Sequence, residues 1–126
     1  VTYDPAKIRY DQLLRVFFAV GADPTQLNYQ GPDHGTQYRN ALVPMNQEQA
    51  KVAAAYLAQL KKSGLWKQTI VTTIEPYKAF YPAEGYHQDF AANNPDHGYI
   101  KRWDAPKVAN LKRLFPDLYK VGFTRN

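Results

Sequence analysis

Apolar residues recur at helical spacing in three stretches of the chain. Residues 10 to 20, 46 to 64 and 104 to 115 each place apolar side chains three and four positions apart, which predicts three amphipathic helices. Asn46 followed by Gln49 resembles an N-cap with its capping-box partner, and Asp104-Ala105-Pro106 is typical of a helix start. The predicted inward faces are Leu13, Val16, Phe17 and Val20, then Ala53, Tyr56, Leu57 and Leu60, then Val108, Leu111, Leu114 and Phe115.

Three other stretches have the patterns of strands. Residues 36 to 43 alternate, with Tyr38, Asn40 and Leu42 on one face and Arg39, Ala41 and Val43 on the other, as a half-buried strand would. Residues 69 to 75 are rich in β-branched side chains and are followed by proline. Residues 1 to 3 resemble the last residues of a strand whose beginning would precede Val1.

Strands interspersed with helices predict an α+β or α/β sandwich. A chain of 126 residues, 44% of them hydrophobic, has the size of one domain and can bury one sizeable core, so we expect a single domain over residues 1–126. The tyrosine-rich segment at residues 80 to 90 holds too many turn-forming residues to be regular throughout.

Several reaction classes lack the residues that they need. The chain has no cysteine, which excludes a disulfide, a thiolate metal site and a cysteine nucleophile within these residues. The only serine, Ser63, lies beside a glycine at a predicted helix end, a poor place for a hydrolase nucleophile. No glycine-rich phosphate loop occurs, and His34, His87 and His97 are not spaced as a helical metal motif, so we expect no metal site.

The charge of the chain is modestly positive. Sixteen lysines and arginines against eleven acidic residues give a net charge of +5, but the basic residues are scattered and indicate a solvated surface better than a nucleic-acid interface. There is neither a long apolar run nor a basic-apolar leader. We therefore expect a soluble chain, cytoplasmic or periplasmic, that binds neither nucleic acid nor membrane.

The tetrapeptide PDHG occurs twice, at residues 32 to 35 and 95 to 98. The second copy follows two asparagines and reads as a turn in which the acid caps backbone amides and the glycine adopts a positive φ. The first copy lies in a long loop and directly precedes the predicted strand with Tyr38. An acid, Asp33, and a phenol, Tyr38, near one strand end would be suited to bind and protonate a polar oxygen.

Five segments in order carry a resemblance to a known family: VTYDPAKI, YDQLLRVFF, DPTQLNYQGPDHGTQYRNAL, FYPAEGYHQDF and PKVANLKRLFPDLY. They resemble peptide methionine sulfoxide reductase A over essentially the whole chain. The resemblance implies a two-layer α/β sandwich related to the ferredoxin-like plait, here lacking its N-terminal elements. It also implies reduction of the S epimer of methionine sulfoxide, in proteins or as the free amino acid, through a cysteine sulfenate.

The same resemblance assigns site residues and a reductant. Asp33 and Tyr38 match active-site positions of the family, where the tyrosine would donate a hydrogen bond to the sulfoxide oxygen and the acid would orient a water or that oxygen. Glu84, Tyr86 and His87 match a segment that lines the substrate pocket, although the same residues would also suit a turn that packs aromatic side chains. The family needs no cofactor beyond thioredoxin or another dithiol.

The departure from the family is the missing thiol. The glycine-cysteine-phenylalanine-tryptophan segment of the family does not occur here, and the tail KVGFTRN has no resolving cysteine. Two hypotheses follow. The chain is a piece of a longer reductase, with a dimer or a further segment covering its exposed sheet, or it is a non-catalytic binding module that keeps the scaffold. On either hypothesis the chain alone should not reduce sulfoxides.

Overall fold

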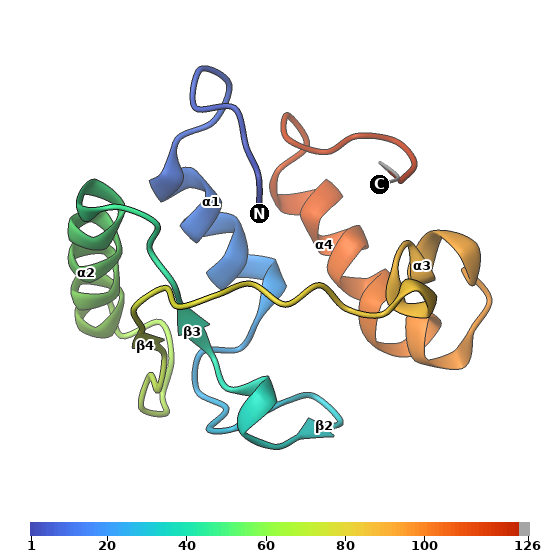
Figure 1. Cartoon of the computed structure of the whole chain (residues 1–126), viewed down its shortest axis with the longest axis horizontal. Helices are drawn as coiled ribbons and strands as arrows, with labels where there is room; N and C mark the ends of the chain where they lie inside the picture. Colours follow the sequence, from blue (N-terminus) through green and yellow to red (C-terminus); the bar gives the residue numbers. More distant parts are fainter. Residues whose placement is uncertain (124–126) are drawn as a thin grey trace. The chain divides into compact units, whose positions relative to one another are not determined.

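The computed structural model describes residues 1–123 and shows a mixed α+β chain of four α-helices and two small sheets (Figure 1). Contacts divide the chain into two compact units, with the boundary along the sequence between Lys78 and Ala79. This division does not test the expectation of one domain over residues 1–126, which stays a prediction. None of the helices within residues 1–123 is long and apolar enough to cross a membrane.

The first predicted helix is confirmed, with a change of winding near its end. Helix α1, Tyr10–Val16, continues as a π-helical turn, η1, Phe17–Gly21. The most buried residues of these two elements are Leu14 and Phe18, each 4% exposed. Neither belongs to the predicted inward face, whose members are only half-buried. The buried face of this helix therefore lies one residue later than the sequence predicts.

The second predicted helix is confirmed as α2, Gln47–Lys62. Its N-terminus is capped as the sequence predicts, because the Oδ1 of Asn46 accepts the backbone N–H of Gln49 at 2.8 Å. The Gln49 side chain reaches back and accepts the N–H of Met45 at 2.9 Å. Gly64, at φ +70°, follows the helix end.

The strands are much shorter than predicted. Strand β3, Ala41–Leu42, pairs in parallel with β4, Thr73–Ile74, so that Ala41 lies opposite Thr73. Residues 1 to 3 form no strand. The N–H of Val71 donates to the carbonyl of Pro24 at 2.8 Å, and Pro24 lies in a loop outside the sheet. The β-branched run therefore contributes two residues to pairing, because its earlier part hydrogen-bonds to a loop.

The core of the first unit lies between α1, α2 and β3, which are side by side in Figure 1. Its buried members are Leu14, Phe18, Leu42, Ala53, Leu57 and Leu60. Beside it, the hydroxyl of Thr72 donates to the side-chain carbonyl of Asn40, and both residues are buried. This pair joins the start of β3 to the start of β4.

The second unit is helical and has little buried surface. It contains η3, Gly85–His87, α3, Phe90–Asn93, η4, Ile100–Asp104, and α4, Ala105–Leu114. Helix α4 confirms the third predicted helix, but Asp104 makes no side-chain cap hydrogen bond. Val108 and Leu114, predicted to point inward, are 40% and 45% exposed, whereas Leu111 and Phe115 are half-buried, so the face was predicted wrongly in part.

Candidate functional site

The first PDHG copy forms a tight hairpin. Strand β1, Tyr29–Gln30, pairs antiparallel with β2, Asp33–His34, around Gly31 and Pro32. Gly31 has φ +55° and proline holds φ near −65°, the combination of signs that a type II′ hairpin turn needs. The ring of Tyr29 stacks on His34 with centroids 4.9 Å apart. Asp33 is thus held, half-buried, on the second strand of a rigid hairpin.

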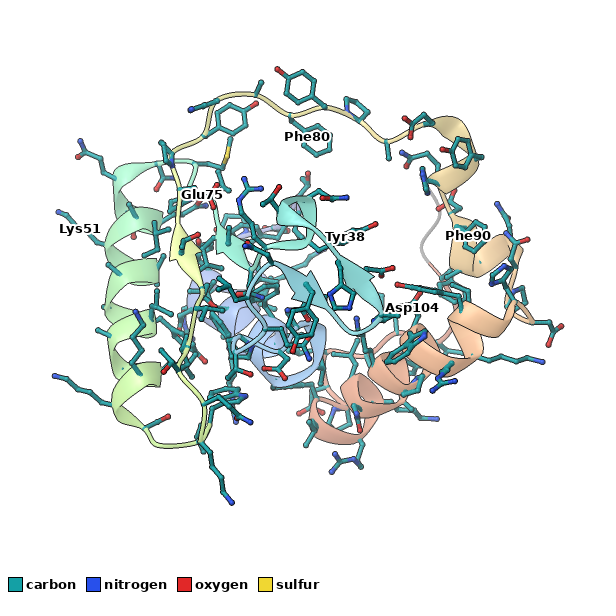
Figure 2. All side chains as sticks on the ribbon, turned by 90° about the horizontal axis from the view of Figure 1, so that it is seen from below. Tyr38, Lys51, Glu75, Phe80, Phe90 and Asp104 are labelled. Carbon is teal, nitrogen blue, oxygen red and sulfur yellow. The ribbon has the colours of Figure 1, made fainter. Side chains whose placement is uncertain are left out.

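Tyr38 lies on a 3₁₀ turn, η2, Thr36–Tyr38, and not on a strand. The strand predicted over residues 36 to 43 is therefore wrong except at Ala41–Leu42, although Asn40 and Leu42 are both buried as the alternation predicts. Gly35, at φ +131°, turns the chain out of β2, and its carbonyl accepts the N–H of Tyr38 at 2.9 Å. Figure 2 shows Tyr38 on this turn, and its side chain is 40% exposed.

The structure keeps Asp33 and Tyr38 on neighbouring elements. β2 and η2 are in contact, and only Gly35 separates them along the chain. The same short segment therefore carries a half-buried carboxylate and an accessible phenol. A hairpin strand stands in place of the strand end that was predicted, and the role of Asp33 and Tyr38 in an active site stays a prediction.

Arg39, which follows Tyr38, forms a bidentate ion pair with Glu75 at the end of β4. Its Nη2 lies 2.8 Å from Oε1 of Glu75, and its Nε lies 2.9 Å from Oε2. The hydroxyl of Thr73 donates to the same Oε2 at 2.9 Å. Hydrogen bonds from Arg39 and then from Thr73 favour the charged carboxylate and lower the pKa of Glu75 to about 2. The Nη1 of Arg39 also donates to the carbonyl of Thr36 at 2.9 Å.

Sequence reasoning missed Glu75. It lies 36 positions after Arg39, at the end of a β-branched run that predicted only a strand. An acid before Pro76 is a weak local signal, because nothing in its neighbours distinguishes a paired glutamate from a solvated one. The contact depends on the parallel register of β3 and β4, which brings the two segments together.

The predicted substrate-binding residues Glu84, Tyr86 and His87 lie in the second unit, on and just before η3. The Nε2 of His87 lies 3.6 Å from Oε2 of Glu84, and the rings of Tyr86 and His87 have centroids 4.3 Å apart. Tyr86 is 72% exposed. Within this segment His87 contacts both Glu84 and Tyr86, and the binding role of the three residues stays a prediction.

The second PDHG copy is a turn, but not the one predicted. Asp96 pairs with Lys101 at 2.9 Å, and the Nδ1 of His97 accepts the N–H of Tyr99 at 3.2 Å. Gly98 is not among the glycines with a positive φ, so that part of the prediction is wrong. The turn is ordered by these local contacts.

Among residues 1–123 no three histidine or acidic side chains gather as a metal site would require.

Comparisons with known proteins give one consistent result. The family described as peptide methionine sulfoxide reductase matches residues 1–118. A protein of Mesorhizobium japonicum named peptide methionine sulfoxide reductase MsrA 2 is 57% identical over 94% of this chain and 61% of its own length. A protein of the same name from Synechocystis is 47% identical over 96% of this chain and 56% of its own length.

A solved structure is similar in fold as well as in sequence. The crystal structure of Mxr1 from Saccharomyces cerevisiae in reduced form has a TM-score of 0.60 and 39% identity, over 75% of this chain and 51% of that chain. The chain therefore resembles part of each of these proteins. It spans 56% to 61% of the length of the Synechocystis and Mesorhizobium relatives.

Proposed function

This chain belongs to the peptide methionine sulfoxide reductase family, and we propose that it carries the proton-donating half of a site that reduces the S epimer of methionine sulfoxide. The observation that carries the proposal is the DHGTQYR segment, which holds Asp33 and Tyr38 on the adjoining elements β2 and η2. The substrate would be a methionine sulfoxide residue in a protein or the free amino acid.

In the proposed reaction Tyr38 acts on the oxygen that leaves the sulfur. A thiolate attacks the sulfoxide sulfur, the S–O bond breaks, and the products are the thioether and a sulfenic acid on the attacking thiol. The oxygen becomes more basic as this bond breaks, so the phenol of Tyr38 would stabilise it by donating its hydrogen bond. The carboxylate of Asp33 would orient a water or the substrate. A second thiol then forms a disulfide and releases water, and thioredoxin or another dithiol reduces that disulfide.

The thiol of this reaction is not on these residues, because the chain has no cysteine. The sulfenate must therefore form on a polypeptide segment other than these 126 residues. The β3–β4 sheet has two strands within the described part of the chain, which leaves each strand one edge where a further segment or a second copy would pair. A two-layer sandwich related to the ferredoxin-like plait would be completed in this way.

We propose a substrate-binding role for Glu84, Tyr86 and His87, which lie in the second unit. All three side chains are exposed and therefore accessible to a ligand. Their weight in the proposal is smaller than that of Asp33 and Tyr38, because local packing accounts for the same contacts.

The absence of cysteine favours a second function, a non-catalytic module that binds oxidised methionine. Such a module would use Tyr38 to recognise the sulfoxide oxygen and would release the ligand unchanged. Both functions predict binding of the S epimer, and only the first predicts turnover when a thiol is supplied by an additional segment.

The deciding experiment combines an intact mass spectrum of the natural polypeptide with a binding measurement. Calorimetry would compare peptides containing methionine (S)-sulfoxide, (R)-sulfoxide and unoxidised methionine, with the variant Tyr38→Phe alongside. We expect the S epimer to bind best and Y38F to weaken that binding without loss of fold. Equal binding of the three peptides would overturn both functions. A natural polypeptide with a cysteine segment that turns over the S epimer would select the reductase.

A further inference from the structure

The turn that carries Tyr38 is weak by itself. Its three residues are closed by two backbone hydrogen bonds, from Tyr38 to Gly35 at 2.9 Å and from Arg39 to Thr36 at 3.1 Å. A 3₁₀ turn has poorer hydrogen-bond geometry than an α-helix, and it occurs mainly in short pieces. Contacts from outside the turn therefore add to what holds the phenol in position.

Arg39, the residue that directly follows the turn, supplies such a contact. Its Nη1 donates to the carbonyl of Thr36 at 2.9 Å, so one guanidinium edge closes the turn a second time. Its Nε and Nη2 face the carboxylate of Glu75 at 2.9 and 2.8 Å. The planar guanidinium can donate to the Thr36 carbonyl and to the Glu75 carboxylate at once, which a lysine ammonium cannot do with the same geometry.

Glu75 is itself held by the sheet. Its backbone N–H donates to the carbonyl of Leu42 at 2.9 Å, which continues the β3–β4 ladder, and its Oε2 accepts the hydroxyl of Thr73 at 2.9 Å. Figure 2 shows Glu75 beside this strand pair. The carboxylate is thus a fixed point of the sheet, and only 29% of its side chain is exposed.

We infer that Glu75 is a positioning residue for Tyr38 and acts through Arg39. The contacts form one continuous path from the β3–β4 sheet to the Glu75 carboxylate, then to the Arg39 guanidinium, and then to the turn with the phenol. An isolated exposed ion pair contributes little, but this one is bidentate and joins two anchored backbones. Its effect is therefore on the place of Tyr38 more than on overall stability.

This inference deepens the proposed function. Only the effect of Glu75 on sulfoxide binding or catalysis rests on that function. A proton donor that is displaced by about 1 Å can lose about a hundredfold in rate. Loss of the Glu75 contact would release the turn from the sheet and would spread the phenol over several positions. Its effect on the sulfoxide ligand should then resemble a weaker form of Tyr38→Phe.

The test is amide hydrogen exchange measured by NMR on the full chain without ligand. The first variant is Glu75→Gln, which removes the negative charge of the carboxylate. The second is Arg39→Lys, which keeps the positive charge but loses the bidentate geometry. We expect the amides of Tyr38 and Arg39 to exchange about fivefold faster or more in both variants. Amides in the middle of α2 should not change. The control is Arg9→Lys, which weakens a comparable exposed pair with Asp11 that has no link to the turn.

Two outcomes would overturn the inference. Unchanged exchange at Tyr38 and Arg39 would show that the turn does not depend on Glu75. Equal acceleration of the α2 amides would show a purely structural role in overall stability. Because this measurement uses no ligand, it can succeed while the proposed function fails. Calorimetry with the (S)-sulfoxide peptide completes the test: if the unaltered chain binds it and E75Q binds as tightly, Glu75 does not position Tyr38 for the ligand.

Discussion

The hydroxyl of Thr72 donates a hydrogen bond to the side-chain carbonyl of Asn40, and both residues are buried where β3 and β4 begin. A buried polar group that loses its partner cannot recover the hydrogen bond from water. This contact therefore helps to determine the register in which Ala41 meets Thr73.

Thr72→Val should destabilise the chain, because valine keeps the shape of threonine and leaves the Asn40 carbonyl without this donor. The expected loss is about 1 to 3 kcal/mol in the free energy of unfolding. Urea denaturation followed by circular dichroism would measure it. Thr69→Val, at an exposed position outside the strand, is the matched control and should change little. A neutral T72V would mean that the buried pair does not contribute to stability.

The carboxylate of Glu75 should titrate far below an ordinary glutamate. Its folded pKa is about 2 against an ordinary value of 4.5, so the stabilisation from its charge is complete above pH 4.5 and is lost as the pH falls through about 2. Carbon-13 NMR of the side-chain carboxyl would give the midpoint.

Arg39→Lys should move the Glu75 midpoint upward, because the fork of hydrogen bonds from the guanidinium is the largest cause of the low pKa. A Glu75 midpoint that stays the same in Arg39→Lys would contradict the ion pair as the main cause of the low pKa.

Asn46→Ala should weaken the start of α2. The Asn46 side chain satisfies one of the N–H groups that have no partner within the helix, and removing such a cap costs about 1 kcal/mol. Thermal unfolding would show a lower melting temperature. Gln47→Ala at the exposed next position is the control, and a melting temperature as low as that of N46A would argue against a capping effect.

Gly35→Ala should disturb the junction between β2 and η2. Gly35 has φ +131°, a conformation that residues with a Cβ rarely adopt, and an added Cβ would also meet the side-chain amide of Gln37. We expect a loss of about 1 to 3 kcal/mol and shifted NMR signals for Tyr38. Gly98→Ala is the matched control, because φ there is not positive and an added Cβ has open space. Unchanged Tyr38 signals in G35A would contradict this account.

The helices could be predicted from the sequence because their signals are local. The spacing of apolar residues located all three, and the Asn46 cap was read from residues only three positions apart. The faces were less predictable. The first helix buries Leu14 and Phe18, one position later than Leu13 and Phe17 of the predicted face, and the second unit has too little core to bury both Val108 and Leu114.

The strand predicted over residues 36 to 43 is confined to Ala41–Leu42 for a physical reason. The alternation of residues 36 to 39 agrees with a strand, but Gly35 turns the chain. The carbonyls of Gly35 and Thr36 then accept the N–H groups of the residues three positions later. These local hydrogen bonds replace the pairing that a strand would need. Asn40 and Leu42 kept their predicted burial, because β3 begins directly after the turn.

The sequence by itself determined where the helices lie, the motif that carries Asp33 and Tyr38, the resemblance to the reductase family and the absence of a thiol among these residues. All of these depend on residue types and short spacings. Only the tertiary structure decided that Tyr38 lies on a 3₁₀ turn and that Arg39 binds Glu75, 36 positions away. That contact forms because β3 and β4 pair in one register, and a pairing between distant segments leaves no periodic signal in either of them.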